Sequence, residues 1–451
     1  MKVAIFGAGY VGLVTGVCLS AIGHDVTVID VSAERVSAIN AGKSPIYEIG
    51  LDALLTETLG SGRFRATLDA KAALEAAELS MIAVGTPQDD GKIDLSYVHA
   101  VTKTIGEHLK TRATRHTVVV KSTVVPGTTG GFVRQMLEKE SGKVAGKDFG
   151  LCMNPEFLRE GTAVADFMEP DRVVVGQLDA ASGDTLEKLY DRFSCPKLRV
   201  DLVNAELIKY ASNTLLATLI SFSNELYGLC EVLPGADGEQ VMDGLALDKR
   251  LSPVVDGKRV SPGILTYLRG GIGYGGSCLP KDLTALRAHA EALKVPTPVL
   301  RSVMDVNAAR PKAITQVLDR EMSGVSGKTV AVLGLAFKPD TDDLRDSPAI
   351  PLVDALLAAG ARVRAYDPQA ADNARGRWGD TIALAKGPEE LLGGADCALL
   401  ATSWSEFAAW DWQKLAKTMS RALVVDGRNA LRKVKWPEGV RYVTVGRGPA
   451  L

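Results

Sequence analysis

The stretch that decides the fold is KVAIFGAGYVG, residues 2–12. A short apolar run leads into a G-x-G-x-x-G motif formed by Gly7, Gly9 and Gly12, and a helical pattern follows as far as Ile22. A second apolar strand ends in Asp30, eighteen residues after the last glycine of the motif. Strand, glycine turn, helix and strand together form a βαβ unit, so the chain is predicted to open with a dinucleotide-binding domain.

Each residue of this motif has a physical reason to be there. Gly7 allows the tight turn, Gly9 lets the backbone approach a pyrophosphate, and Gly12 lets the helix pack closely on the strand. A carboxylate at Asp30 binds both ribose hydroxyls and repels a 2′-phosphate, which favours NAD over NADP. The alternative is a glycine-rich structural turn with Asp30 as an ordinary turn residue, and it explains the full context less well.

The rest of the first domain continues the same alternation. Apolar runs at 79–84, 117–121 and 150–153 are separated by helical stretches, as in a parallel, doubly wound sheet. With 451 residues, the chain is too long for one ordinary core and is expected to form two or three domains.

The middle of the chain has a different pattern. No proline interrupts residues 202–233, where apolar residues recur at helical spacing, so one long helix is predicted to bridge domains or form a subunit interface. A second alternating region opens at 328–334 without the full glycine fingerprint. We therefore expect an α/β fold with two Rossmann-like doubly wound domains joined by a central all-α region with one long helix. The predicted domain bounds are 1–200, 201–310 and 311–451.

Composition excludes several classes of protein. The chain has 52 Lys and Arg against 54 Asp and Glu, so no overall basic field favours nucleic acid as a partner. Six cysteines are scattered without C-x-x-C spacing, which predicts neither a metal site nor a disulfide scaffold. Residues 3–22 are uncharged, but four glycines and the absence of a cleavage motif argue against a signal peptide. No later stretch has the ~18 apolar residues that a membrane span needs, so a cytoplasmic protein without membrane contact is expected.

A second informative stretch is GSCLPKD, residues 276–282. Pro280 suits the first turn of a helix, which places Cys278 at the helix N-terminus, where the helix dipole and free N–H groups favour a thiolate. Asp282 lies four residues on and can reach the same pocket as an acid or base. The alternative is a buried, inert cysteine with Asp282 as an ordinary first-turn charge.

Other polar residues are predicted to gather at a ligand cleft. Lys209 and Asn213 lie four residues apart on one face of the long helix, where they can stabilise an oxyanion or simply form a solvated face. The segments VGTP (84–87), KSTVVPG (121–127) and NPEFLREG (154–161) follow predicted strands, at the sheet edge where open α/β sheets bind ligands. A capping role for their hydroxyls and acids is the alternative.

These stretches together resemble the UDP-glucose/GDP-mannose dehydrogenase family along essentially the whole chain. The resemblance implies oxidation of the C6 primary alcohol of a nucleotide sugar to a carboxylate, with two NAD⁺ and one water, through an enzyme thioester. It implies that the first domain binds NAD, that the central domain carries the nucleophile and forms a homodimer or higher oligomer, and that the last domain binds the nucleotide sugar.

The resemblance also implies roles for individual residues. Cys278 is the nucleophile, Lys209 and Asn213 stabilise oxyanions, Asp282 with Thr123 positions or activates water, and Glu156 and Glu160 serve proton transfer and hydrolysis. The implied NAD contacts, besides the three glycines, are Val11, Asp30, Arg35, Thr86, Thr123, Glu160, Lys281 and Arg345. The implied substrate contacts are Glu156, Phe157, Leu158, Arg159, Lys209, Asn213, Arg250, Tyr267, Leu268, Arg269, Gly270, Gly271, Gly275 and Lys338, with Arg428 as a weaker candidate.

The choice of substrate stays open at this point. The form of residues 154–161 is that of the UDP-glucose and GDP-mannose branches, and residues 170–176, PDRVVVG, favour UDP-glucose. GDP-mannose or another nucleotide sugar is the alternative. The segment between Arg250 and Tyr267 is longer than usual in the family and is a candidate nucleotide-facing loop. More remote hypotheses are a single-step dehydrogenase of the 2-hydroxyacid type, which needs no thiol, and an NAD-sensing scaffold without catalysis.

Overall fold

The computed structural model describes residues 1–89 and 91–450. The chain divides into two compact units, one formed by residues 1–212 with 284–289 and the other by residues 213–283 with 290–451. Helix α9 (Leu202–Val232) and helix α11 (Leu279–Ala292) each contain residues of both units.

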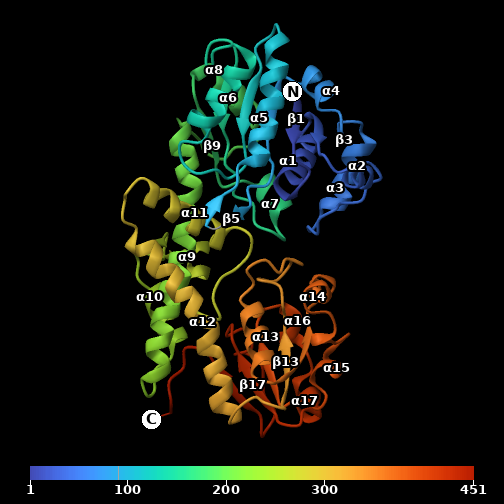
Figure 1. The fold of residues 1–451 in the computed structure, drawn as a ribbon. Helices are drawn as coiled ribbons and strands as arrows, with labels where there is room; N and C mark the ends of the chain where they lie inside the picture. The colour runs from blue at the N-terminus through green and yellow to red at the C-terminus, as the bar shows by residue number, and fades with distance from the viewer. Residues whose placement is uncertain (90, 451) are drawn as a thin grey trace. The chain divides into compact units, whose positions relative to one another are not determined.

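The first unit is built on a sheet with the strand order β10-β9-β8-β7-β4-β1-β2-β3 (Figure 1). The pairs from β3 to β8 are parallel, and β9 is antiparallel to β8. The chain order reverses between β1 and β4, which makes the loops after these two strands the switch point where such sheets bind ligands. The strands are β1 (Lys2–Phe6), β2 (Asp25–Ile29), β3 (Phe64–Thr67), β4 (Leu79–Ile82), β7 (Thr117–Val120), β8 (Gly150–Met153), β9 (Val173–Gln177) and β10 (Lys197–Asp201).

Helices cover both faces of this sheet because its strands are apolar on both sides. Val3 and Ile5 of β1 lie in one buried cluster with residues of α1, α3 and α7, and Ala4 and Phe6 lie in another with residues of α4, α5 and α6. The helices are α1 (Tyr10–Ala21), α2 (Ala33–Asn40), α3 (Leu51–Gly60), α4 (Ala70–Ala76), α5 (Ser96–Thr111), the π-helix η1 (Thr129–Val133), α6 (Arg134–Ser141), α7 (Ala163–Met168) and α8 (Ala180–Leu189). A small hairpin joins β5 (Gln88–Asp89) and β6 (Lys92–Ile93).

The second unit contains a parallel sheet with the order β15-β14-β13-β16-β17-β18 (Figure 1). Alternate residues of β13 again face two cores, with Val330 and Val332 on one side and Ala331 and Leu333 on the other. The strands are β13 (Thr329–Leu333), β14 (Arg362–Tyr366), β15 (Ala383–Leu384), β16 (Cys397–Leu400), β17 (Leu423–Asp426) and β18 (Arg441–Thr444). The helices are α13 (Ala349–Ala358), α14 (Ala371–Trp378), α15 (Pro388–Leu392), α16 (Ser405–Ala409), α17 (Trp412–Leu415), and the 3-10 turns η3 (Gly379–Thr381) and η4 (Ala416–Thr418).

The segment between the two sheets is mainly helical and contains the predicted long helix, α9. It also contains α10 (Gly238–Ala246), the 3-10 turn η2 (Gly263–Tyr267), α11 and α12 (Pro298–Met322). The prediction of an entirely helical segment missed one feature, a short antiparallel hairpin of β11 (Val254–Val255) and β12 (Lys258–Arg259). Its turn residues Asp256 and Gly257 have φ angles of 49° and 74°, the left-handed backbone of a two-residue Asp-Gly hairpin turn.

The predicted fold class is confirmed, since two Rossmann-like sheets and a central helical segment are present. None of the helices in the described part of the chain is long and apolar enough to cross a membrane.

Candidate active site

The glycine turn between β1 and α1 has the backbone that its sequence predicts. Gly7 has a φ of +102°, and a Cβ there would lie within 3.0 Å of the Ala83 carbonyl oxygen. A Cβ at Gly12 would collide with the Gly7 carbonyl, so α1 packs directly on the turn. At Gly9, the N-cap of α1, an added Cβ would meet none of the described atoms within 4 Å. This open side at a helix N-terminus fits a pyrophosphate, because the first N–H groups of the helix lack partners within it.

Asp30 lies at the end of β2, directly beside this turn. Its carboxylate accepts hydrogen bonds from the Ala8 N–H at 2.8 Å and the Ser32 N–H at 2.9 Å, and pairs with Arg35 at 3.1 Å. Burial alone raises the pKa of Asp30, but these three donors outweigh it and hold the pKa below its ordinary value. An ionised carboxylate at this position can accept hydrogen bonds from ribose hydroxyls. The predicted NAD contact Val11 lies half-buried in the first turn of α1.

The loop after β4, at the switch point, lies beside the loop after the neighbouring strand β7. The Thr86 hydroxyl, after β4, donates to the Thr123 carbonyl, after β7, at 2.9 Å. The Ser122 hydroxyl donates to the Val84 carbonyl at 2.7 Å. The predicted ligand residues Thr86 and Thr123 are thus brought side by side.

The first unit also contains a buried ion pair. The Lys209 ammonium lies 2.8 Å from the Glu156 carboxylate, and both side chains are almost completely shielded from water. Burial raises the pKa of Glu156, but Lys209 and the Leu158 N–H more than compensate, so the pKa lies below its ordinary value. Because Lys209 and Asn213 are both buried, the alternative of a solvated helix face is wrong.

In the second unit, Cys278 is exposed and directly precedes α11, with Pro280 in the first helical turn. The alternative of a buried cysteine is therefore wrong. Asp282 is fully buried, accepts a hydrogen bond from the Asn213 amide at 2.6 Å, and pairs with Lys281 at 2.6 Å. Two predicted site residues, Asn213 and Lys281, thus contact the carboxylate of a third, Asp282, in the first turn after the cysteine.

The glycine-rich run before Cys278 is tightly enclosed. Leu268, Gly270, Gly271 and Gly275 are buried, while Tyr267 and Arg269 are half-buried. A Cβ at Gly275 would collide with the Asp346 carbonyl, and the Gly276 N–H donates to the Arg345 carbonyl at 2.9 Å. This places the predicted NAD contact Arg345 beside the run that leads to the cysteine.

The remaining predicted substrate contacts lie in separate places. The Phe157 ring lies 4.0 Å from the Arg172 guanidinium, Leu158 is half-buried, and Arg159 pairs with Asp166 at 2.5 Å. Glu160, half-buried, follows in the same loop. The Lys338 ammonium lies 5.7 Å from the Phe337 ring, which packs against Gly276. The Arg250 side chain is 89% exposed and pairs with Asp248 at 2.5 Å.

Comparison with known proteins identifies the family. The NAD binding domain of the UDP-glucose/GDP-mannose dehydrogenase family matches residues 1–194, its central domain matches 203–309, and its UDP binding domain matches 331–433. The chain belongs to this family. It is therefore an enzyme, an NAD-dependent nucleotide-sugar dehydrogenase.

Individual relatives of this dehydrogenase carry two different substrate names. A UDP-glucose 6-dehydrogenase of Rhizobium meliloti (strain 1021) is 40% identical over 457 residues, covering 99% of this chain and 100% of the relative. A GDP-mannose 6-dehydrogenase of Pseudomonas savastanoi pv. phaseolicola is 44% identical over 368 residues, covering 81% of each. The solved UDP-glucose dehydrogenase of Pyrobaculum islandicum matches with a TM-score of 0.88 and 38% identity, over 99% of this chain and 97% of that one.

Two buried acids without a predicted role hold loops that carry predicted site residues. Buried Glu48 accepts hydrogen bonds from the Gly161 and Ala163 N–H groups at 2.7 and 2.8 Å and from the Tyr10 hydroxyl, and so fixes the loop that carries Glu160. Buried Glu206 accepts from the Gly127 and Thr129 N–H groups and fixes the loop after Thr123. Glu206 stands in the stretch 206–210 that carries the family resemblance, but its hydrogen-bond partners lie far away in the sequence, so this role was not predicted.

Lys121, at the end of β7, is a further buried charge near the Glu156–Lys209 pair. Its ammonium donates to the Asn154 side-chain oxygen at 3.0 Å, which also accepts from the Tyr190 hydroxyl at 2.6 Å. Burial lowers the pKa of Lys121 to about 8; the Glu156 carboxylate opposes this shift and the Lys209 ammonium adds to it. Among the described residues, no cluster of His, Cys, Asp and Glu forms a metal site.

Proposed function

We propose that this nucleotide-sugar dehydrogenase is a UDP-glucose 6-dehydrogenase that oxidises the C6 alcohol of UDP-glucose to the carboxylate of UDP-glucuronate. The observation that carries the proposal is the exposed Cys278 thiol at the N-terminus of α11, one turn before the buried Asp282. A two-electron dehydrogenase of the 2-hydroxyacid type has no use for a thiol in this place. A four-electron oxidation has a use for one, because the aldehyde formed in the first step must be held for the second.

The overall reaction balances as one primary alcohol, two NAD⁺ and one water giving a carboxylate, two NADH and three protons. When bound, NAD⁺ supplies the hydride acceptor for both oxidations. The Cys278 sulfur adds to the aldehyde carbon to give a thiohemiacetal, and loss of a second hydride and a proton leaves a thioester. Water then attacks the thioester carbon, and the carbon–sulfur bond breaks to return the thiolate.

The roles of the other residues follow from their chemistry. Lys209 and Asn213 supply a cation and an amide donor for the oxyanions that form at the sugar carbon. Glu156, held ionised beside Lys209, is suited to accept a proton, and Glu160 shares proton transfer and hydrolysis with it. Asp282, with Thr123, positions or activates the attacking water.

The uridine nucleotide is favoured by two observations. The last part of the chain matches a domain described as UDP binding, and the UDP-glucose relative matches over essentially its whole length. The GDP-mannose relative has slightly higher identity over a shorter stretch, so GDP-mannose 6-dehydrogenase is the second candidate. We extend the proposal to three domains at 1–200, 201–310 and 311–451, a homodimer or higher oligomer, and a cytoplasmic enzyme whose product serves polysaccharide biosynthesis.

The test is a panel of UDP- and GDP-sugars in which NADH is counted per sugar consumed. We expect UDP-glucose to give two NADH and a uronic acid without free aldehyde. One NADH per sugar would contradict the four-electron mechanism, and a higher kcat/KM for GDP-mannose would assign the second candidate.

A further inference from the structure

The ring of Tyr227, on α9, is enclosed by glycines from three distant parts of the second unit. A Cβ at Gly238, Gly270 or Gly446 would in each case lie within 3.0 Å of a ring carbon of Tyr227. These glycines belong to the first turn of α10, to the glycine-rich run before Cys278, and to the segment after β18. Because the ring contacts backbone on each of these sides, a shift of the ring displaces main chain rather than flexible side chains.

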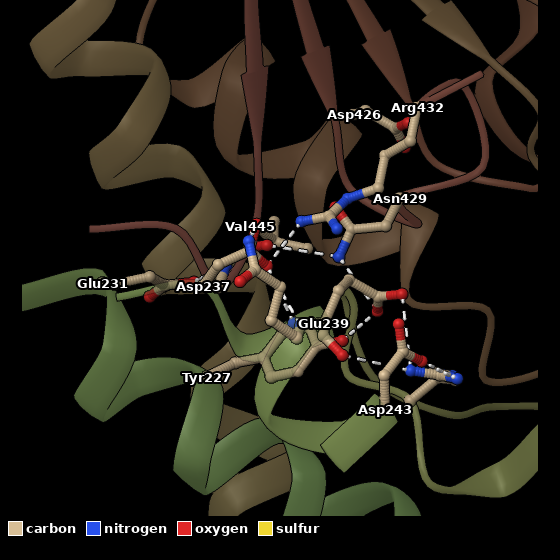
Figure 2. Close-up of polar contacts among 12 residues, drawn as sticks. Tyr227, Glu231, Asp237, Glu239, Asp243, Asp426, Asn429, Arg432 and Val445 are labelled. Carbon is tan, nitrogen blue, oxygen red and sulfur yellow. Dashed lines mark hydrogen bonds and ion pairs between the residues drawn. The ribbon is translucent and has the colours of Figure 1, made fainter. Parts of the chain in front are cut away.

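The hydroxyl of Tyr227 donates a hydrogen bond to a carboxylate that also binds residues of other segments. It donates to Glu239, whose same oxygen accepts from the Asn429 amide at 3.4 Å (Figure 2). The other Glu239 oxygen lies 3.5 Å from the Arg269 guanidinium, which also pairs with Asp243 at 2.6 Å. Glu239 therefore joins the tyrosine to the first residue of the run 269–271.

Hydrogen bonds fix the backbone of this run from α9 itself and from α12. The Gly271 N–H donates to the Asn224 side-chain oxygen at 2.7 Å, and the Gly271 carbonyl accepts from the Arg310 guanidinium at 2.9 Å. Arg310 also pairs with Glu231 at 3.1 Å, and Glu231 accepts from the Gly446 N–H at 2.9 Å. The segment after β18 thus reaches the run both through Tyr227 and through Glu231.

We infer that Tyr227 is a positioning residue that fixes the backbone of residues 269–271 and thereby sets the affinity for the nucleotide sugar without contacting it. The effect on nucleotide-sugar affinity rests on the proposed function, because residues 267–271 are substrate contacts only if that proposal holds. The backbone of Gly270 and Gly271 is not restricted by side chains of its own, because glycine has large conformational freedom. Its conformation therefore depends on contacts with other segments. Removing the ring leaves a cavity into which the run can relax.

The test compares two variants of Tyr227 with a matched control in the full-length enzyme. Tyr227→Phe keeps the ring and removes the hydroxyl, and Tyr227→Leu removes the ring. The control, Tyr442→Phe, removes from β18 a part-buried hydroxyl that donates to Asp426 at 2.8 Å. For Tyr227→Leu we expect the KM for UDP-glucose to rise about tenfold with the KM for NAD⁺ within about twofold of wild type, and for Tyr227→Phe a smaller rise of the same kind.

Deuterium uptake supplies a readout that does not depend on the substrate. We expect the peptide covering residues 267–276 to exchange faster in both Tyr227 variants and at the wild-type rate in Tyr442→Phe. Wild-type uptake and an unchanged KM for the sugar would overturn the inference, and so would equal rises in both KM values. If wild-type enzyme oxidises no nucleotide sugar, the proposed function fails, and the uptake of this peptide still decides whether Tyr227 fixes the run. If Tyr227→Leu does not fold, Tyr227→Phe decides by the same two measurements.

Discussion

At the scale of single residues, Cys278 separates four-electron from two-electron chemistry. Replacing it by serine keeps the shape but supplies a hydroxyl with no comparable ionised population near neutral pH. We expect Cys278→Ser to lose steady-state turnover by several orders of magnitude, about the cost of removing a nucleophile, while it still binds the nucleotide sugar. Calorimetric titration and intact mass measure the retained affinity and any trapped adduct. Two NADH per sugar at near wild-type rate in this variant would exclude the covalent mechanism.

Asp30 is expected to determine the choice between NAD⁺ and NADP⁺. Its carboxylate neutralises Arg35, and an added 2′-phosphate would meet that carboxylate at close range. In Asp30→Asn the side-chain oxygen can still accept from the Ala8 N–H, while Arg35 loses its counter-charge and becomes available to the phosphate. We expect the ratio of kcat/KM for NADP⁺ to that for NAD⁺ to rise by about a hundredfold. A wild-type enzyme with comparable kcat/KM for the two cofactors would contradict the role of Asp30.

Lys121 gives the stability of the fold a pH dependence that can be isolated. Burial lowers the pKa of its ammonium from 10.5 to about 8. The Glu156 carboxylate opposes this shift, and the Lys209 ammonium adds to it. Between these values the unfolded chain binds more protons than the folded one, so the free energy of unfolding rises with pH in this window. We expect the Tm of wild type minus that of Lys121→Met to be constant below about pH 8 and to increase towards about pH 10. A constant difference up to that pH would show that Lys121 titrates normally in the folded state.

Sequence reasoning found the residues whose signal is local and missed those whose signal is tertiary. Gly7, Asp30 and Cys278 stand in patterns that fix their place at a strand end or helix start, and the structure has them there. Tyr227 and Glu48 have no such pattern. Their partners come from loops that are close only in the folded chain, and an apolar helix position such as Tyr227 reads as ordinary core.

At the scale of elements, α9 presents an apolar row that its own unit leaves uncovered. Leu215, Phe222 and Leu229, spaced seven residues apart, are 50%, 46% and 55% exposed. Such a seven-residue spacing of apolar side chains is typical of a helix that pairs with another helix. We expect a homodimer at minimum, with this row in the interface.

The prediction is tested by sedimentation at micromolar concentration. Phe222→Glu places a charge in the middle of the row and is expected to shift the protein to the monomer. Val144→Glu is the matched control, because Val144 is an equally exposed apolar residue (51%) outside α9. A fully active wild-type monomer would refute the dimer.

Elements with strong periodicity were predictable and short elements were not. The bounds of α9 differ from the predicted 202–233 by one residue, because an unbroken apolar pattern of this length has few alternatives. The hairpin of β11 and β12 escaped prediction because strands of two residues carry no alternation, although its Asp256-Gly257 turn is a recognised hairpin signal.

At the scale of the whole molecule, the chain uses one topology twice. In each sheet, the strand that comes first in the chain lies between the second and the fourth strands and is parallel to both: β1 lies between β2 and β4, and β13 between β14 and β16. Only the sheet of the first unit has a complete glycine fingerprint after its first strand. The opening turn of the second sheet, at Gly334, has a φ of +87°, and a Cβ added there would lie within 3.0 Å of Thr402. The complete glycine fingerprint predicted NAD binding in the first domain, which matches the NAD binding domain of the family.

The way in which the chain is threaded through its two units limits how the gene can be divided. Residues 284–289 belong to the first unit, although the residues on both sides of them belong to the second. A single cut after residue 212 therefore leaves the first fragment without these six positions and gives the second fragment six that it does not need. No single point of fission yields two complete units. We therefore expect truncated expression products of this enzyme to need α11 joined to residues of both units.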